Sequence, residues 1–366
     1  MIRVFSMFTG IGGFEYGIES ALNHQCETGE VLESVPDGAG ELPSWECVGY
    51  SEIDKHATAV YKYHYGTEVK NYGDATRINP EDIADFDLLV GGFPCQAFSL
   101  AGKRRGFEDT RGTLFYEVAR IAKSKRPRLM VLENVKGLCN HDEGKTLATI
   151  LSAIWELGYE YQWGVVNSRY HGVPQNRERI LIVCNLRGTP RPEVFPLVGT
   201  ILADSREGEA AGVILQHSRD EHGNTVAYNA KECAGTVKQP SGNQQNFLLV
   251  RGDTAHESDV ANTLDANYYK GLGANQTRAG IVTPTLTARC DDRGFFQRQL
   301  MEQTALIRRL TPLECERLQA FPDDWTRYGI NEKGEEYLVS DTQRYKMCGN
   351  AVTTSVIAAV MRKVLK

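Results

Sequence analysis

Long apolar runs, paired cysteines and a leader peptide are all missing from this 366-residue sequence. No stretch of about 18 consecutive apolar residues occurs, which excludes a membrane-spanning helix. The chain opens on a strand-like apolar pattern at residues 1–7 rather than on a signal peptide. The nine cysteines are scattered without any Cys-x-x-Cys pair, and this argues against a disulfide framework and a structural zinc site. We therefore expect a cytoplasmic protein that binds neither a membrane nor a metal.

Excess positive charge is also missing, because the formal net charge is −6. Residues 27–46 account for this charge, since they carry six carboxylates and no Lys or Arg. Residues 95–130, in contrast, carry nine Lys or Arg against three acids. Such a local cationic stretch suits the phosphate backbone of a nucleic acid, although a solvated loop and helix face would have the same composition.

Apolar runs alternate with amphipathic segments over the first 185 residues. We expect strands at residues 3–7, 46–51, 86–90, 128–132, 160–166 and 179–184, and helices at 13–24, 54–65, 112–124 and 144–156. Strands and helices in this order predict an α/β fold with a doubly wound, mostly parallel sheet. Residues 27–44, which are acidic and contain Gly and Pro, predict a surface loop between the first helix and the second strand.

The amino-acid composition of the sequence changes after residue 192. Residues 200–300 are rich in Gly, Asn, Thr and Gln and show only short β-type runs, which predicts a second, smaller, loop-rich β domain. A helix is expected to open at Thr311, with Pro312 at its first position and Glu314 three residues after the cap. Residues 351–365 have helical spacing and would cover an apolar face.

The most informative stretch is Gly-Gly-Phe-Pro-Cys-Gln-Ala-Phe at residues 91–98. It follows the apolar run 88–90, which is typical of a buried parallel strand. The glycines permit a sharp turn, and Pro94 fixes φ directly before Cys95. The thiol is therefore expected on a stiff turn at the carboxyl end of a strand, where open α/β sheets bind their ligands. This placement favours a nucleophile over a core residue.

One further segment and two single carboxylates are typical of a sheet edge that binds a nucleoside. The glycine-rich residues 8–14 lie between the first strand and the first helix, where backbone N–H groups can approach an anionic ligand. Glu52 ends the second strand and could accept hydrogen bonds from ribose hydroxyls, or it could be a solvated cap. Asp74 could bind an adenine amino group, or it could serve an ordinary turn.

A carboxylate and two guanidinium groups follow buried strands farther along the chain. Glu133 comes after the apolar run 129–132, where an ionised group is costly without a partner or a task. Arg177 and Arg179 alternate with the strand period just before the run 180–183, so both are expected on one face. A structural ion pair between Glu133 and one of these arginines is the simpler interpretation.

Taken in order, these motifs resemble the DNA (cytosine-5)-methyltransferases of prokaryotes and phages. The matching blocks are residues 8–14, Glu52, residues 73–74, 92–96 with 98–99, 111–112, 133–135, Gln175 with Arg177 and Arg179, 309–312, 316–319, 321–322 and 349–352. Two positions depart from the family pattern: Ser6 replaces the usual acid, and Ile53 stands where a larger residue often covers adenine. The loop at residues 27–44 is an insertion.

The resemblance implies the fold of S-adenosylmethionine-dependent methyltransferases in two parts. Residues 1–188 with 344–366 would form the catalytic and cofactor-binding domain, and residues 189–343 the target-recognition domain. S-adenosylmethionine would be the cofactor and S-adenosylhomocysteine the product, with no metal. The implied cofactor residues are Phe8, Thr9, Gly10, Gly12, Gly13, Glu52, Ile53, Asp74, Ala75, Pro94, Asn350 and Val352.

The resemblance also implies a covalent mechanism. Cys95, followed by Gln96, would add its thiolate to cytosine C6 and so make C5 nucleophilic. Glu133 would supply a proton or strong hydrogen bond at N3. Arg177 would bind the cytosine carbonyl and hold Glu133, and Arg179 would complete this catalytic group.

Duplex DNA is the implied partner, and the target base must be flipped out of the helix. Residues 96–111 resemble the mobile loop that closes on DNA in this family. The candidate DNA-binding residues are Ser99, Lys103, Arg104, Arg105, Thr263, Leu264, Thr285, Leu286, Arg289 and Arg293. Of the two Thr-Leu pairs, the distance to the block at residue 309 favours Thr285-Leu286. We expect a monomer, with a cognate restriction endonuclease as an optional partner in a bacterial or phage-infected cell.

Two other functions have to be weighed against DNA methylation. A tRNA cytosine methyltransferase of the same fold would have a small recognition region and a Cys-Phe-Thr signature, and neither is found here. A regulatory subunit without activity usually loses the cysteine or the glutamate, and both are present.

Overall fold

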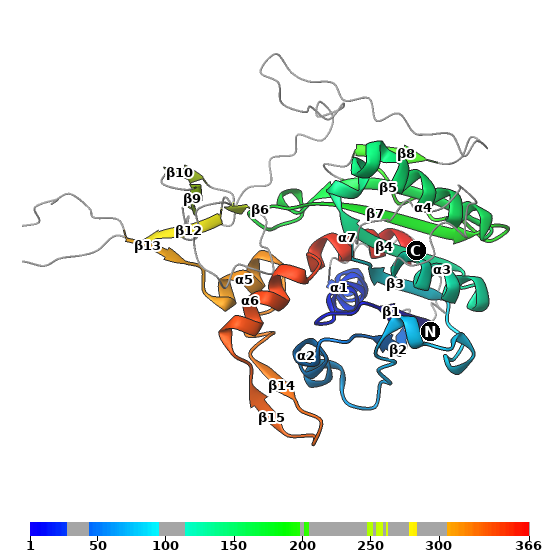
Figure 1. Cartoon of the computed structure of the whole chain (residues 1–366), viewed down its shortest axis with the longest axis horizontal. Helices are drawn as coiled ribbons and strands as arrows, with labels where there is room; N and C mark the ends of the chain where they lie inside the picture. Colours follow the sequence, from blue (N-terminus) through cyan, green and yellow to red (C-terminus); the bar gives the residue numbers. More distant parts are fainter. Residues whose placement is uncertain are drawn as a thin grey trace, which may run out of the picture.

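A computed structural model describes most of the chain (Figure 1). The described residues are 1–27, 44–94, 114–197, 201–204, 247–251, 254–258, 261–262, 278–283 and 306–365. The predicted acidic loop at residues 27–44 therefore lies almost wholly outside the described residues.

A seven-stranded sheet organises the first part of the molecule, in the order β2-β1-β3-β4-β7-β5-β8. Its strands are β1 (Ile2–Met7), β2 (Trp45–Ser51), β3 (Leu88–Gly92), β4 (Leu129–Val135), β5 (Tyr159–Asn167), β7 (Glu178–Leu186) and β8 (Ile201–Asp204). The pairs β1–β2, β1–β3 and β3–β4 are parallel, whereas β7 runs antiparallel to both β4 and β5, and β8 runs antiparallel to β5. Five strands thus point one way, which confirms the mostly parallel α/β sheet.

Apolar residues alternate along the central strands and bury both faces of the sheet. Phe5, Met7 and Leu89 belong to one core with α3 (Leu114–Lys125) and α4 (Lys145–Glu156). Val4 and Val90 belong to the opposite core with α1 (Gly13–Glu27) and α7 (Thr354–Val364). Because successive side chains of a strand point to opposite faces, this alternation creates a layer of helices on each side.

The C-terminal part of the chain returns to the sheet. Figure 1 shows α7 beside α1, and these two helices pack against each other although they lie at opposite ends of the sequence. The predicted terminal helix is thereby confirmed and is placed in the first part of the molecule. The predicted helices of the first 185 residues are confirmed too, with α2 (Lys55–Tyr65) as the remaining one.

A third apolar cluster joins α2 to Phe321 and Trp325, which follow α5 (Pro312–Leu318), and to α6 (Asp341–Asn350). Thr311 caps α5 as expected, in a reciprocal capping box with Glu314. A hairpin of β14 (Tyr328–Ile330) and β15 (Glu336–Leu338) connects α5 to α6, and in Figure 1 its tip projects away from the sheet.

A smaller antiparallel sheet has the order β10-β9-β12-β13. It consists of β9 (Phe247–Arg251), β10 (Thr254–Ser258), β12 (Arg278–Thr283) and β13 (Leu306–Arg309), and Figure 1 shows it apart from the larger sheet. A short bridge connects the two regions, because β11 (Ala261–Asn262) pairs with β6 (Gln175–Asn176). The boundaries expected at residues 188–189 and 343–344 stay predictions. No helix within the described ranges has the length and apolar character needed to span a bilayer.

Candidate active site

The glycine-rich loop between β1 and α1 has a backbone that few other sequences could adopt. Phe8, Gly10 and Gly12 all have positive φ values, of 54°, 59° and 85°. A Cβ atom on Gly12 would lie 2.4 Å from the Tyr65 ring, so this position requires glycine. The strained turn presents loop backbone at the carboxyl end of β1, as a nucleotide-type ligand needs.

Glu52 fixes this loop from the neighbouring strand. Its Oε2 accepts a hydrogen bond from the Gly10 N–H at 2.8 Å, and its Oε1 accepts from the Ile53 N–H at 2.8 Å. Asn71 in turn holds the backbone of Glu52 through its side-chain amide. The Ile53 side chain next to it is 78% exposed, which is unusual for a large apolar residue and fits a residue that covers a flat ligand.

Asp74 lies on the same edge and caps a short 3-10 turn, η1 (Ala75–Arg77). Its Oδ1 accepts hydrogen bonds from the Thr76 N–H and hydroxyl, which lower the pKa of the exposed carboxyl. The turn role weighed in the sequence is thus realised, and Ala75 is buried behind it. A role of Asp74 toward adenine stays a prediction.

The end of β3 approaches the end of β4 closely. A Cβ atom on Gly92 would lie 3.1 Å from Glu133 Oε2, so glycine leaves room for this carboxyl group. The buried side chain of Asn134 donates a hydrogen bond from Nδ2 to the Phe93 carbonyl at 2.8 Å. This bond fixes the backbone two residues before Cys95. Pro94 is exposed and is the last described residue before the cysteine.

Glu133 forms a mostly buried ion pair with Arg179. Glu133 Oε1 lies 3.0 Å from Arg179 Nε, and the two side chains are 12% and 17% exposed. Burial raises the pKa of Glu133, and the positive charges of Arg179 and Arg177 oppose this shift. Burial therefore favours the protonated carboxyl group, whereas the two arginines favour its ionised form.

Arg177 corrects one expectation. It was expected to hold Glu133, but Arg179 makes the ion pair. The guanidinium of Arg177 is buried and donates from Nη2 to the carbonyls of Ala351 and Gly349, at 2.7 and 3.2 Å. The two arginines diverge because Arg179 belongs to β7, whereas Arg177 lies in the turn that precedes this strand.

Val352 brings the C-terminal segment close to the glycine loop and to the end of β3, whereas the cofactor role of Asn350 stays a prediction. A Cβ atom on Gly13 would lie 2.7 Å from Val352 Cγ2, and one on Gly92 would lie 3.9 Å from Val352 Cγ1. Val352 therefore lies between the glycine loop and the end of β3. Asn350 ends α6 and is exposed.

The family model for C-5 cytosine-specific DNA methylases matches residues 2–366. The chain belongs to this family. It is therefore a methyltransferase that acts at C5 of cytosine in DNA.

Several bacterial and phage enzymes are similar to this DNA methylase. It is 36% identical to the type II methyltransferase M1.ScrFI of Lactococcus lactis subsp. cremoris, over 100% of this chain and 78% of that protein. It is 32% identical to the type II methyltransferase M.HhaI of Haemophilus parahaemolyticus, over 97% of this chain and 92% of the relative. The orphan methyltransferase M.SPRI of Bacillus phage SPR is 30% identical over 100% of this chain and 97% of its own length.

Solved structures share the fold of the methylase at low sequence identity. Dnmt2 of Spodoptera frugiperda, solved as a mutant with three alanine substitutions, matches with a TM-score of 0.60, 17% identity and full coverage of both chains. Dnmt2 methyltransferase of S. pombe matches with a TM-score of 0.58 and 19% identity, over 100% of this chain and 98% of that one. These likenesses confirm the methyltransferase fold.

Part of the predicted site falls outside the described residues of the methylase. These residues are Cys95, Gln96, Ser99, Lys103, Arg104, Arg105, Thr263, Leu264, Thr285, Leu286, Arg289 and Arg293. Among the residues that are described, no group of three or more His, Cys, Asp or Glu side chains could hold a metal ion.

Sequence reasoning missed the supports of the site. Asn134 and Asn71 each hold a backbone segment on which a candidate residue stands. The role of Asn134 could have been suspected from the sequence, because Asn134 is the middle residue of the Glu-Asn-Val motif. Asn71 had none, since an asparagine before a glycine turn is common.

Proposed function

We propose that this methylase transfers a methyl group to C5 of a cytosine in duplex DNA through a covalent bond between Cys95 and cytosine C6. The main support for this proposal is the mostly buried carboxyl group of Glu133. It is paired with Arg179 and lies close to Gly92, and Gly92 precedes Cys95 by three residues. An acid therefore lies at the end of β3, from which the chain continues toward Cys95. Addition of a nucleophile to a pyrimidine ring needs both a thiolate and a nearby acid that stabilises the charge on the ring.

Cys95 would act as the nucleophile. Its thiolate forms a bond to C6, and the displaced ring electrons accumulate toward N3 and make C5 nucleophilic. After C5 has been methylated, a base removes the C5 proton, the C6–Sγ bond breaks and the thiolate leaves. The cationic stretch at residues 95–130 favours the ionised thiol.

Glu133 and Arg179 would stabilise the ring during addition. The raised pKa of Glu133 allows its carboxyl group to donate a proton or hydrogen bond to N3. Because Arg179 Nε lies 3.0 Å from Glu133 Oε1, we assign to Arg179 the carbonyl-binding role first expected of Arg177. Arg177 instead fixes the C-terminal segment.

S-adenosylmethionine is the cofactor that the site fits, and it supplies an electrophilic methyl group when bound. The positive-φ loop with Gly10 and Gly12, the carboxylate of Glu52 and the exposed Ile53 form one edge of the sheet. Backbone N–H groups there suit a carboxylate, an acid suits a ribose diol and an apolar side chain suits a purine face. The remaining cofactor candidates are Phe8, Thr9, Gly13, Asp74, Ala75, Pro94, Asn350 and Val352.

Duplex DNA would be bound between the catalytic part (residues 1–188 and 344–366) and the recognition part (residues 189–343). The basic loop that follows Cys95 would close on the phosphates of a flipped base. We also propose that the protein is a monomer in solution. The type II relatives motivate the further proposal that a restriction endonuclease of the same specificity accompanies it in some hosts.

Replacing Cys95 by alanine tests the mechanism. We expect Cys95→Ala to lower methyl transfer from labelled cofactor to DNA by about 10⁴-fold or more, with DNA binding retained. Cys47→Ala is the matched control, because Cys47 is half-buried on β2 away from the site. Duplex DNA containing 5-fluorocytosine should form a covalent adduct with the wild-type protein and with Cys47→Ala but not with Cys95→Ala, since fluorine blocks the final elimination.

Two outcomes would contradict the proposal. Full activity of Cys95→Ala would remove the covalent step. Transfer to tRNA in place of duplex DNA, compared under the same conditions, would replace the substrate. Bisulfite sequencing of the methylated DNA then identifies the recognised sequence.

A further inference from the structure

The glycine loop is supported from the C-terminal side as well as by Glu52. The third apolar cluster contains Ile11 of the loop, Val60 of α2, and Trp325 and Met347 from the C-terminal segment. Ile11 and Trp325 are both buried. Residues far apart in the sequence therefore meet directly beneath the loop.

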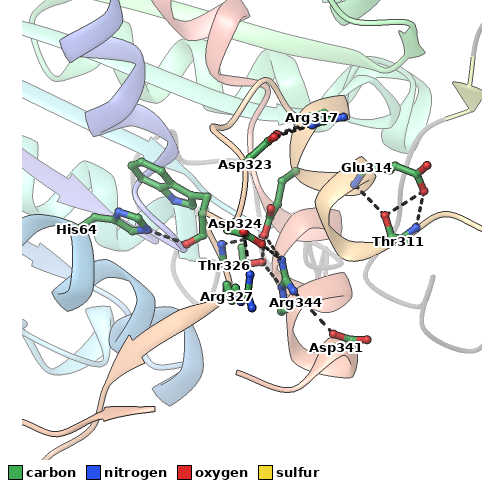
Figure 2. A network of polar contacts seen from close by, with 12 residues as sticks. His64, Thr311, Glu314, Arg317, Asp323, Asp324, Thr326, Arg327, Asp341 and Arg344 are labelled. Carbon is green, nitrogen blue, oxygen red and sulfur yellow. Dashed lines mark hydrogen bonds and ion pairs between the residues drawn. The ribbon is translucent and has the colours of Figure 1, made fainter. Parts of the chain in front are cut away.

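Trp325 makes the direct contact with the loop. Its indole Nε1 donates a hydrogen bond to the Ile11 carbonyl at 3.0 Å, across 314 positions of the sequence. The imidazole of His64 stacks on the indole with ring centres 3.6 Å apart and an interplanar angle of 5°. His64 Nε2 also lies 2.7 Å from the Trp325 carbonyl oxygen. In Figure 2 a dashed line from the labelled His64 ring marks this contact. Both the ring and the backbone of Trp325 are thus fixed.

A buried polar network sets the turn that carries Trp325. Glu316 is fully buried and pairs with Arg344 at 2.9 Å. Its Oε1 also accepts from the Thr326 N–H at 2.9 Å. Figure 2 shows Arg344 reaching toward Thr326 and Asp324, and the Arg344–Asp324 distance is 3.5 Å. A buried charge is retained at such cost where it fixes one geometry, and here that geometry is the turn at residues 321–327.

The loop needs this support because its own conformation is strained. Phe8 has a φ of 54°, which costs a non-glycine residue free energy, and Gly10 and Gly12 are also left-handed. The Gly10 N–H is already bound to Glu52. On its other side the loop is held at two carbonyls, because Ile11 accepts from the Trp325 indole at 3.0 Å and Gly12 accepts from the Tyr65 hydroxyl at 3.3 Å.

We propose that Trp325 is a positioning residue for the cofactor, whose indole N–H holds the glycine loop in the conformation that binds S-adenosylmethionine. This inference rests on the proposed function, because it assumes that the loop binds this cofactor. Trp325 does not touch the reacting atoms. Its loss should weaken cofactor binding and leave the chemical step intact.

Trp325→Phe tests this role, since phenylalanine keeps an aromatic ring but loses the N–H donor. We expect the dissociation constant of S-adenosylhomocysteine, measured by calorimetry without DNA, to rise by about tenfold. The KM for S-adenosylmethionine should rise equally, with kcat at saturation within about twofold of wild type. Hydrogen exchange should quicken in the peptide covering residues 8–16.

Trp163→Phe is the matched control, because Trp163 is also buried but lies in β5, and its Nε1 has no hydrogen-bond partner among the described residues. It should leave cofactor affinity unchanged. His64→Ala, which removes the stacked ring from α2, should weaken affinity by a smaller factor and decides the question if Trp325→Phe does not fold.

Wild-type cofactor affinity in Trp325→Phe would overturn the inference, and so would a lower kcat at unchanged KM. If Trp325→Phe does not fold, wild-type affinity in His64→Ala would overturn it. A wild-type protein that binds no S-adenosylhomocysteine would instead overturn the proposed function. The two failures are therefore distinguishable.

Discussion

Single buried carboxyl groups show how environment decides what a residue can do. Glu133 has an arginine partner and lies at the end of a strand beside the predicted nucleophile. Glu15 is fully buried in the first turn of α1, but no Lys or Arg of the described residues pairs with it. Burial raises the pKa of Glu15 to about 7, and neither carboxyl oxygen has a hydrogen-bond partner among the described residues.

Replacing Glu15 by glutamine should make stability less sensitive to pH. The folded protein holds Glu15 protonated, so its stabilisation is fully present below about pH 4.5 and is lost as pH rises through about 7. Relative to wild type, Glu15→Gln should gain about 3 kcal/mol in free energy of unfolding between pH 5 and pH 9. Urea unfolding at several pH values measures this difference.

Glu46→Gln is the control, because the side chain of Glu46 is 51% exposed. It should follow the wild-type pH dependence. Parallel curves for wild type and Glu15→Gln would show that burial of Glu15 does not govern stability.

Helices α1 and α7 illustrate what sequence patterns predict about elements. Periodicity predicted both helices, and the capping residues predicted the start of α5, because such signals are local. Their packing partners were not predictable in the same way. Gly17 allows the close approach of the helices, since a Cβ atom there would lie 2.5 Å from Ile357 Cγ2.

Gly17→Ala should therefore destabilise the protein. The added methyl group would meet Ile357 Cβ at 2.7 Å as well, so a backbone shift is needed. We expect a net loss of about 2 kcal/mol, because the overpacking cost exceeds the gain in helix propensity. Chemical unfolding measures the loss. Gly137→Ala, where the new atom would meet only Val135 Cγ2 at 3.9 Å, should change stability little.

At the scale of the whole molecule, the C-terminal segment completes the site. Gln175 donates to the Leu318 carbonyl at 2.7 Å, and Arg177 donates to the carbonyls of Gly349 and Ala351. Lys346 pairs with Asp54 at 2.7 Å, next to Glu52. The motif Gln-x-Arg-x-Arg is therefore divided between two tasks, with Gln175 and Arg177 binding the returning chain and Arg179 facing Glu133.

Lysine substitutions should separate these tasks. Arg177→Lys should lower the free energy of unfolding by about 2–4 kcal/mol, because a buried ammonium cannot reproduce the guanidinium geometry. Its kcat should stay near wild type where the protein is folded. Arg179→Lys should lower kcat by about 10²-fold with a smaller stability loss. Unfolding curves and steady-state kinetics, measured on both variants, give the comparison. A stable but inactive Arg177→Lys would restore the role first expected for Arg177.

The sequence by itself determined the α/β fold, the strand and helix positions, the cap at Thr311 and the family. These features depend on local periodicity, turn chemistry and motif order, all of which are visible in a linear chain. Only the tertiary structure decided that Arg179 rather than Arg177 pairs with Glu133, and that Trp325 holds the Ile11 carbonyl. The physical reason is that both contacts join segments far apart in the chain, and their geometry is set by packing that no local pattern encodes.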